Sequence, residues 1–323
     1  MRTSTVDVHL DELEQYRREL TGYCYRMLGS VFEADDAVQE TMVRAWKAAD
    51  SFEGRSAVRS WLYRIATNVC LDMLRGRQRR NRAMDLGRTF TADSFKGETR
   101  PNDTWLEPIP DARVVDPADT DPAELVATRD SIRLAFVAAL QHLPAKQRAV
   151  LILREVLRWQ ATEVAALLDT SVASVNSALQ RARATLAARD IESSPAAIDA
   201  DQEALLARYV DAFERYDIES LVSLLHEDAV MTMPPYDFWL HGPVEMGTWF
   251  LGTGIGCKGS RLVPTTGANG CAAFGSYRVD PAGGWAPWAV QVIEVSGDRI
   301  VGHHNFLDTD LFAAFGLPAH LEV

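Results

Sequence analysis

The chain has 323 residues, more than one typical domain, and 47% of them are apolar. Its four cysteines (Cys24, Cys70, Cys257 and Cys271) form no CxxC pair and no metal-ligand spacing, so we expect a reducing compartment and neither a metal nor another cofactor. The first twenty residues lack the apolar core of a signal peptide, and no stretch approaches the roughly 20 apolar residues of a membrane span. We therefore expect a soluble, cytoplasmic protein without membrane contact.

The net charge of −12 is distributed unevenly along the chain. Residues 200–323 carry 16 acidic and 6 basic side chains, whereas the first 199 residues carry 29 and 27. Within the first part, residues 55–88 contain nine arginines and two acidic residues. Residues 141–189 contain seven basic and three acidic residues. Residues 90–124, between these blocks, hold nine carboxylates and three basic residues. Because phosphate affinity depends on the local patch, two basic modules flanking an acidic segment remain compatible with nucleic-acid binding.

Residues 1–80 have helical periodicity throughout. Apolar residues line one face of the first helix: Leu10, Leu13, Tyr16, Leu20, Tyr23 and Met27. A second helix carries an acidic face with a cation and an aromatic residue one turn further on: Asp35, Asp36, Gln39, Glu40, Arg44 and Trp46. This face is either a protein-docking surface, with Trp46 as its packing anchor, or a solvated acidic face near a helix start.

Residues 59–80 combine two aromatic residues, Trp61 and Tyr63, with a run of arginines. The arginines are Arg59, Arg64, Arg75, Arg77, Arg79 and Arg80. Aromatic rings beside cations can stack on unpaired bases while guanidinium groups hold phosphates. The alternative is that Trp61, Leu62 and Ile65 are core residues, and for Trp61 packing is the favoured interpretation.

Residues 81–122 lack periodicity and contain Pro101, Pro108, Pro110, Pro117 and Pro122, which predicts an extended linker. Its WLEPIPDAR stretch (105–113) is more distinctive than the rest of the segment, and it could equally be an apolar anchor on a domain surface.

Residues 123–190 return to helical periodicity and contain two short helices joined by a tight turn. In TEVAALLDTSVASVNSALQRAR (162–183), Asp169, Thr170 and Ser171 separate two apolar faces, and Ser171 can cap the second helix. The outer face of that helix is small, polar and basic: Ser174, Asn176, Ser177, Gln180, Arg181 and Arg183. Such side chains suit base edges and phosphates, which favours a DNA-binding helix-turn-helix over a buried helical hairpin.

After a short ESSPAA stretch (192–197), the last part of the chain opens with helices and continues with strand-like runs. We expect helices over 201–216 and 218–225 and strands over 230–233, 270–279, 288–295 and 300–307. Aromatic and titratable residues are candidates to line one pocket: Tyr236, Asp237, Phe238, Trp239, His241, Trp249, Trp285, Trp288, His303 and His304. Adjacent residues of a strand point to opposite faces, so at most one of the two adjacent histidines faces that pocket.

Together these blocks resemble regions 2 and 4 of the extracytoplasmic-function (ECF) sigma factors of the sigma-70 family, over about residues 8–188. The resemblance rests on ADDAVQETMVRAWKA (34–48), RSWLYRIATNVCLDMLRGRQRR (59–80), LPAKQRAVLILREVL (143–157) and the helix-turn-helix. The last 120 residues, with WLHG (239–242), resemble a SnoaL-like domain of the nuclear-transport-factor type, which some actinobacterial sigma factors carry.

The resemblance implies a multidomain chain with two all-α sigma domains and an α+β, cone-shaped C-terminal domain. The expected parts are region 2 (1–80), an acidic linker (81–122), region 4 (123–190) and a SnoaL-like regulatory domain (198–323). Region 2 would bind the β′ clamp helices of core RNA polymerase through the acidic face, and region 4 would contact the β flap. Region 2 would also melt the −10 element, with Asn68, Asp72 and the loop 76–80 near the non-template strand. Region 4 would read the −35 element.

In this family the linker threads the polymerase active-site cleft and the RNA exit path. Its carboxylates would then occupy space that RNA phosphates later fill; the candidates are Asp103, Glu107, Asp111, Asp116, Asp119 and Asp121. One departure concerns the recognition helix, where Asn176 and Ala178 stand at positions that are usually cationic, and Asp169 replaces a common turn glycine. We therefore expect weaker −35 affinity.

The sequence predicts a promoter-specificity subunit that is not itself an enzyme and whose C-terminal domain modulates it by intramolecular contacts. For that domain, regulation or small-molecule sensing is favoured over catalysis with Asp237, His241 or His303 as base, and over a purely structural role. Two rival classes stay open for the whole chain. One is an ordinary helix-turn-helix regulator that acts without polymerase, and the other is an enzyme with an appended DNA module.

Overall fold

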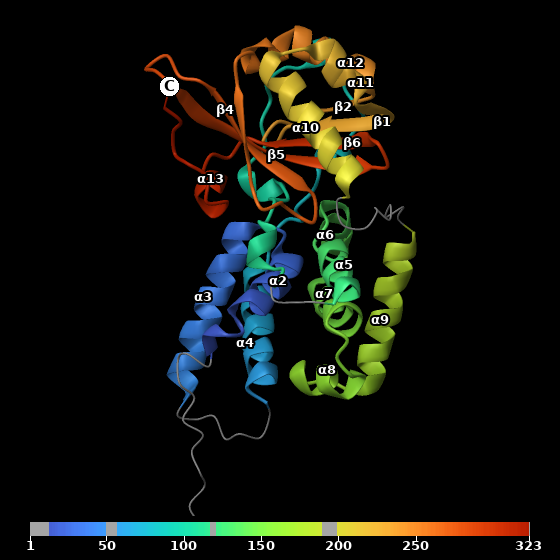
Figure 1. The fold of residues 1–323 in the computed structure, drawn as a ribbon. Helices are drawn as coiled ribbons and strands as arrows, with labels where there is room; N and C mark the ends of the chain where they lie inside the picture. The colour runs from blue at the N-terminus through green and yellow to red at the C-terminus, as the bar shows by residue number, and fades with distance from the viewer. Residues whose placement is uncertain (1–12, 50–56, 117–120, 189–198, 323) are drawn as a thin grey trace, which may run out of the picture. The chain divides into compact units, whose positions relative to one another are not determined.

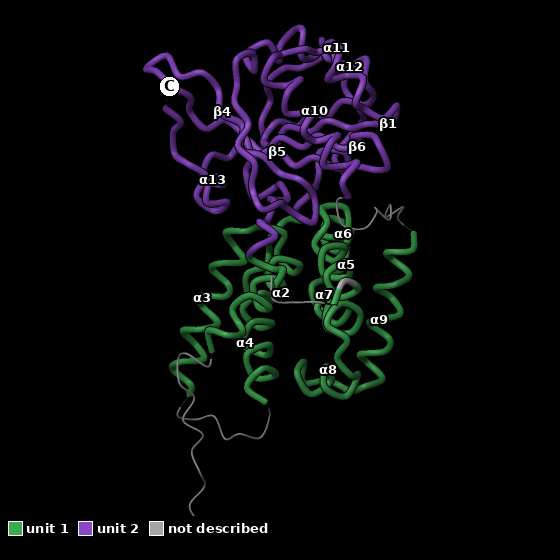
Figure 2. The backbone as a smooth tube through the Cα atoms, in the orientation of Figure 1, with its two compact units in different colours: residues 1–79, 113–192 green, residues 80–112, 193–323 purple. Residues whose placement is uncertain are grey.

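The computed structural model describes residues 13–49, 57–116, 121–188 and 199–322. Leu10, Asp119 and the ESSPAA stretch at 192–197 lie outside these residues. The chain divides into two compact units: unit 1 combines residues 1–79 with 113–192, and unit 2 combines residues 80–112 with 193–323 (Figure 2). Both units are therefore built from segments that are separated in the sequence.

Unit 1 is helical (Figure 1). Its helices are α2 (Arg17–Leu28), α3 (Val31–Ala48), α4 (Val58–Met73), α5 (Pro122–Asp130), α6 (Leu134–Gln141), α7 (Ala145–Leu151), α8 (Ala161–Leu167) and α9 (Val172–Ala187), with a π-helical turn at Ile152–Val156. The turn between α2 and α3 is tight because Gly29 takes the left-handed conformation (φ 75°) and Ser30 caps α3 by accepting from the Glu33 amide at 3.1 Å.

Two buried arginines join the α2–α4 half of unit 1 to the α5–α9 half. Arg148 donates to the backbone oxygen of Met27 and, at 2.6 Å, to the side chain of Gln141, and Arg26 donates to the Ser131 carbonyl at 3.1 Å. Burial lowers the pKa of both guanidinium groups to about 10, so both stay charged at neutral pH. Carbonyl oxygens rather than carboxylates satisfy these charges, so the two halves are held by polar, directional contacts as well as by apolar packing.

Unit 2 contains one six-stranded sheet in the order β2-β1-β6-β5-β4-β3, in which β1 and β6 are parallel and the other neighbours antiparallel. The strands are β1 (Leu225–Thr232), β2 (Trp239–His241), β3 (Arg261–Pro264), β4 (Ala272–Val279), β5 (Trp285–Ser296) and β6 (Arg299–Phe306). The helices are α10 (Ala200–Arg215), α11 (Ile218–Ser223), α12 (Pro243–Leu251) and α13 (Leu311–Ala314), with a 3-10 turn at Thr253–Cys257. The main apolar core combines side chains of α10–α12 with side chains of the sheet, and it includes Tyr209, Phe213 and Phe250. The predicted fold class, helical domains plus an α+β domain, is confirmed.

Residues 80–112, here called the captured segment, differ from the expected extended linker. They are irregular, with 3-10 turns at Ala83–Asp85, Ala92–Ser94, Asn102–Thr104 and, at the end, Asp111–Arg113. Their backbone pairs repeatedly with the C-terminal part of the chain: Phe90 donates to the Trp239 carbonyl at 3.0 Å, and Asn269 donates to the Ile109 carbonyl at 3.1 Å. Ala92 belongs to the apolar core of unit 2, and Phe90 and Phe95 pack against it, so this segment is part of the second unit's fold.

Among the described residues, no helix combines the length and apolar character needed to cross a membrane.

Candidate nucleic-acid and polymerase interfaces

The acidic face predicted for polymerase docking lies on α3. Asp36, Gln39, Glu40 and Arg44 are exposed, and Arg44 pairs with Glu40 one turn earlier at 2.7 Å. Trp46, 60% exposed, stands on the same helix. The predicted docking face, Trp46 included, is therefore accessible to solvent on this helix.

Asp35 is engaged by an arginine from a distant part of the sequence. Arg113, which follows the captured segment, pairs with the Asp35 carboxylate, and Arg18 pairs with Asp116 at 2.7 Å. Between these two pairs, Val114 packs so closely on α2 that a Cβ at Gly22 would stand 2.6 Å from its Cγ1 atom. Residues 113–116 are therefore anchored on α2 and α3.

Along α4 and the turn that follows it, side chains spaced three or four residues apart are all exposed: Arg64, Asn68, Asp72 and Arg75. The sequence predicted these four as contacts near the −10 element. Asp72 lies 3.3 Å from Arg75 and 3.9 Å from Arg44.

Two arginines of α4 are engaged by the second half of unit 1. Arg59 pairs with Glu19 at 2.9 Å, and its guanidinium lies over the rings of Tyr63 and Trp159, 5.4 Å from each centroid. Arg64 donates to the Ala166 carbonyl of α8 at 3.0 Å. Both groups were predicted to hold −10 DNA, and in this conformation both bind protein.

The two aromatic residues of the block have different environments. Tyr63 is fully buried, with its ring centroid 5.2 Å from that of Tyr23 and 5.0 Å from that of Trp159, and burial raises the pKa of its hydroxyl. A base cannot stack on a ring enclosed in this way, so the placement of Tyr63 differs from the predicted DNA-facing role. Trp61 is half-buried.

The arginines that follow α4 are also paired. Arg77 binds Glu33, and Arg79 contacts a ring nitrogen of His142. Arg80 belongs to unit 2, where it is buried and donates to the Trp105 carbonyl at 2.6 Å and to Glu107 at 3.3 Å. Arg80 therefore anchors the captured segment in this structure, whereas the sequence assigned it to DNA.

The helix-turn-helix forms as predicted, from α8 and α9. Asp169 takes the left-handed conformation (φ 49°) at the turn, and Ser171 caps α9 by accepting from the Ser174 amide at 3.1 Å. The apolar face (Val175, Leu179 and Ala182) is buried. All seven predicted −35 contacts are exposed: Ser171, Ser174, Asn176, Ser177, Gln180, Arg181 and Arg183. Arg183 pairs with Glu155 at 2.6 Å.

The carboxylates assigned to the RNA path have different environments. Glu107 and Asp111 are buried in unit 2, where Asp111 accepts from the Gly270 amide at 2.8 Å. Asp103 is exposed, and Asp121 caps α5 by accepting from the Ala123 amide at 2.9 Å. Glu107, which pairs with Arg80, and Asp111 therefore contribute to the fold of unit 2 in this structure.

The aromatic residues predicted to line a ligand pocket enclose a side chain of the captured segment instead. The Phe95 ring lies with its centroid 5.1 Å from that of Tyr236, 5.0 Å from that of Phe238 and 4.9 Å from that of Trp249. The neighbouring Ala92 amide donates to Glu245 of α12 at 2.8 Å. Phe95 occupies the space among these rings in which a ligand was expected.

His303 is a core residue with satisfied hydrogen bonds. It lies 2.8 Å from the hydroxyl of Tyr209, which also donates to Gln291 at 2.7 Å, and 3.3 Å from the amide of Asn305. Burial, with a smaller contribution from His304, lowers its pKa to about 3, so the ring is neutral at pH 7. His304 contacts Thr232 at 2.9 Å, so the adjacent histidines have different partners, as predicted for consecutive strand residues.

The remaining pocket candidates do not converge on one site. Arg100 of the captured segment donates to the Asp237 carboxylate at 2.9 Å. His241 is half exposed on β2, with its Nε2 atom 3.5 Å from Asp228. Trp288 stacks under the guanidinium of Arg278, whose central carbon lies 3.7 Å from a ring centroid of the indole. The pocket predicted from these residues is not assembled.

Sequence reasoning missed two aromatic residues. Trp159 packs beside Arg59 and Tyr63 of the predicted −10 surface, and Phe95 fills the predicted ligand pocket. Trp159 follows the π-helical turn and is buried on Tyr63 and Arg59. Phe90 and Phe95 offered a signal, because large aromatic residues in an aperiodic, proline-containing stretch indicate an irregular segment that packs on a domain.

Comparison with known proteins matches both halves of unit 1 to sigma-70 families. The model "Sigma-70 region 2" matches residues 13–80, and "Sigma-70, region 4" matches residues 133–186. The chain is 46% identical over 314 residues to the ECF RNA polymerase sigma factor SigG of Mycobacterium tuberculosis (strain CDC 1551 / Oshkosh), covering 95% of this chain and 83% of the relative. It is 29% identical to the sigma factor SigJ of M. tuberculosis H37Rv, covering 70% of this chain and 64% of that relative. The crystal structure of M. tuberculosis SigJ has the same fold, with a TM-score of 0.59 and 23% identity, covering 96% of this chain and 100% of that one.

Proposed function

This chain belongs to the ECF RNA polymerase sigma factors, and from that premise we propose that its C-terminal unit regulates initiation by holding the captured segment. As a sigma factor, the chain directs transcription initiation at specific promoters. In the regulatory step, unit 2 and the polymerase cleft compete for residues 80–112, because these residues connect region 2 to region 4.

Each exposed surface of unit 1 has a role in this proposal. The α3 face with Trp46 docks on the β′ clamp helices of core polymerase, and region 4 contacts the β flap. The exposed side chains of α4 meet the −10 element, and the outer face of α9 meets the −35 element in the major groove. The exposure of α9 and of Trp46 supports these assignments.

The observation that carries the proposal is the burial of the captured segment in unit 2. Ala92 belongs to the apolar core of unit 2, Phe95 lies among its aromatic rings, and the Asp111 carboxylate accepts from the Gly270 amide at 2.8 Å. A linker that threads the polymerase cleft cannot keep these side chains in the core of another domain. Capture and threading therefore exclude each other, and unit 2 restrains initiation for as long as it holds the segment.

Unit 1 adds a second condition for activity. Arg59 lies over Trp159, and Arg64 donates to the Ala166 carbonyl, so region 4 must leave α4 before these two arginines are free of it. The contact between the two halves of unit 1 contains several hydrogen bonds from arginines to carbonyl oxygens, and water or a partner can replace such bonds at modest cost. Polymerase binding is the event proposed to separate the halves.

A reversible cross-link tests the capture step directly. Thr99 and Tyr236 lie opposite each other in an isolated antiparallel bridge, flanked by hydrogen bonds from Arg100 to Pro235 (2.9 Å) and from Asp237 to Glu98 (3.3 Å). Such non-hydrogen-bonded pairs have Cα atoms about 4.5 Å apart, within disulfide range. In the full chain, Thr99→Cys with Tyr236→Cys should give run-off transcription at least about tenfold weaker when oxidised, with recovery on reduction.

The control is the Thr99→Cys single variant treated with the same oxidant, which should keep its activity because the four native cysteines are buried. Equal transcription from the oxidised and reduced double variant would refute the capture proposal. Ending the chain after about Arg189 is the complementary experiment: transcription should rise, and an unchanged level would also count against the proposal.

A catalytic role for unit 2 gains no support from the contacts. Asp237 is paired with Arg100, and His303 is enclosed by Tyr209, Phe213 and Phe250. We propose regulation by this unit and no turnover.

A further inference from the structure

A cavity in unit 1 is lined by both of its halves and encloses about 300 Å³ of free space, the size of a small-molecule site. The α2–α4 half contributes Gly22 and Arg26 of α2 and Arg59 of α4. The α5–α9 half contributes Thr128 of α5 and Leu157, which follows the π-helical turn. A molecule in this cavity would therefore touch both halves of the unit.

One charged group of the lining has no counterion. Arg26 is 4% exposed, and among the described residues no carboxylate pairs with it. Its Nε atom donates to the Ser131 carbonyl at 3.1 Å and its Nη2 atom to the Ser131 hydroxyl at 2.5 Å, but no described residue accepts from Nη1. A Cβ atom at Gly22 would stand 2.9 Å from Nη1, so this nitrogen lies beside a residue of the cavity wall. A buried guanidinium without a counterion is costly, and an anion in the cavity would lower that cost.

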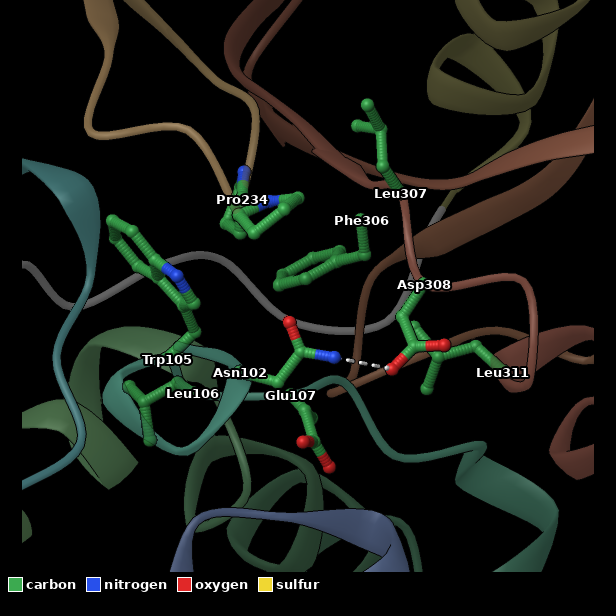
Figure 3. Close-up of a pocket in the computed structure, with 10 residues that line it drawn as sticks. Asn102, Trp105, Leu106, Glu107, Pro234, Phe306, Leu307, Asp308 and Leu311 are labelled. Atoms are coloured by element: carbon green, nitrogen blue, oxygen red, sulfur yellow. Dashed lines mark hydrogen bonds between the residues drawn. The ribbon is translucent and has the colours of Figure 1, made fainter. Parts of the chain in front are cut away.

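The other charged residues of the lining define the charge of a suitable ligand. Arg59 is paired with Glu19 at 2.9 Å, whereas Glu124 and Arg158 are exposed. With Arg26, the lining has three arginines and two glutamates, an excess of one positive charge. That excess fits a monoanion better than a phosphate or nucleotide with several charges. The hollow of unit 2 in Figure 3 differs, because none of the ten described residues that line it is basic.

Apolar side chains contribute the rest of the walls: Val114, Ala127, Val156 and Leu157. Small-molecule sites combine such walls with a few polar groups that fix the orientation of the ligand. A carboxylate matches the planar guanidinium, and a short hydrocarbon skeleton matches the walls.

We propose that this cavity binds a small organic monocarboxylate, whose carboxylate accepts from Nη1 of Arg26 and whose apolar part lies against Val114 and Leu157. Such a ligand would contact both halves of unit 1, so its binding would favour the conformation in which region 4 engages Arg59 and Arg64. That regulatory consequence rests on the proposed function, whereas the binding itself does not.

The test uses 4-fluorobenzoate and 4-fluorobenzamide, two rings of nearly the same shape of which only the first is charged at pH 7. Their affinities for the full chain are measured by ¹⁹F NMR titration. Hydrogen bonds between charged partners are stronger than neutral ones, so the wild-type chain should bind the benzoate about tenfold more tightly than the benzamide. Arg26→Gln, which removes the buried charge, should bind both rings equally.

A second variant does not depend on the folding of Arg26→Gln, because it changes an exposed side chain. Glu124→Gln removes one carboxylate from the lining, so it should tighten benzoate binding about threefold and leave benzamide binding unchanged. Glu203→Gln is the matched control and should change neither affinity. Like Glu124, Glu203 is an exposed glutamate in the first turn of a helix, but it lies on α10 in unit 2.

The proposal is overturned if 4-fluorobenzoate does not bind saturably, if it binds no more tightly than the benzamide, or if its advantage survives in folded Arg26→Gln. Equal benzoate affinities of Glu124→Gln and Glu203→Gln would also contradict it. Unchanged transcription from the cross-linked chain would refute capture as the regulatory step and would leave these binding results standing.

Discussion

Helices α4 and α9 are the two DNA-facing elements of the sigma-70 pattern, and the structure leaves them in opposite states. On α9 every predicted contact is exposed, and the apolar face that holds the helix in place is on the other side. On α4, Asn68 and Asp72 are exposed, but Arg59 and Arg64 are bound by groups of the same unit. In the proposed function, the outer face of α9 can meet the −35 element directly, whereas Arg59 and Arg64 must first leave their partners on region 4 to contact the −10 element.

This difference shows that arginines on two helices of one unit can differ in whether they are free to bind DNA. Arg181 needs only the amphipathic pattern of its own helix to reach solvent. The availability of Arg59 depends instead on Trp159, a residue about one hundred positions away. Basic composition locates a nucleic-acid surface, whereas tertiary contacts decide when that surface can act.

The largest expected effect concerns the event that would release α4. Trp46→Ala should weaken binding to core polymerase about 30-fold, as for an interface hot spot worth about 2 kcal/mol. The stability of the free chain should not change, because the indole is 60% exposed. Fluorescence titration with core polymerase measures this, with Leu251→Ala, another exposed apolar residue, as the control. Equal affinities of both variants would remove Trp46 as the docking anchor.

A tenfold effect is expected on α4 itself. Arg64→Ala should lower run-off transcription about tenfold, or about 1.4 kcal/mol, in the range of a DNA-contacting arginine. The free protein should lose less than about 1 kcal/mol, since only one hydrogen bond to a carbonyl disappears. Arg17→Ala, an exposed arginine of α2 that pairs with Glu14, is the matched control. A large loss of stability with normal transcription would assign Arg64 to structure and break the comparison.

On α9 the expected effect is smaller and has a characteristic salt dependence. Arg181→Ala should weaken promoter binding by the holoenzyme a few-fold for all sequences, and the slope of log K against log salt should fall by about one. Arg208→Ala on α10 should leave the slope unchanged. If Arg181→Ala changed the preferred −35 sequence instead, the side chain would be a base reader.

The smallest effect tests the turn that orients α9. Asp169 has φ 49°, a conformation that costs an ordinary L-residue about 1 kcal/mol. Asp169→Ala should therefore lower the free energy of local opening of α8–α9 by about that amount, and Asp169→Gly should not. Hydrogen exchange of the α9 amides measures this. Faster exchange in both variants would indicate that the carboxylate, rather than the backbone conformation, holds the turn.

Local patterns predicted the helices and the exposed faces well. The helix-turn-helix, the Ser171 cap, the left-handed tolerance of Asp169 and the exposure of Trp46 follow from periodicity and turn chemistry over a few residues. The separate partners of His303 and His304 follow from strand alternation alone.

The remainder depends on contacts between distant segments, which local patterns do not encode. Phe95 and Tyr236 are far apart in the sequence and meet only in the folded unit. The sequence around either residue therefore does not predict that Phe95 fills the space that Tyr236 lines. Arg80 continues an arginine run but is buried by Trp105 and Glu107, whose positions follow no period. A stretch of residues 81–112 with several large apolar side chains was the available clue that the predicted linker packs.

The discontinuous make-up of unit 2 also sets the order in which the molecule can fold during translation. Residues 80–112 leave the ribosome before residues 193–323 have been made, so their eventual partners in the sheet do not yet exist. Phe95 and Ile109 stay without their native neighbours over that interval, and closing this long loop is slow compared with forming helices. If unit 2 restrains initiation as proposed, every newly made chain passes through a stage in which its sigma regions are complete and the restraint is not. A polymerase that meets the chain at that stage would meet it before capture.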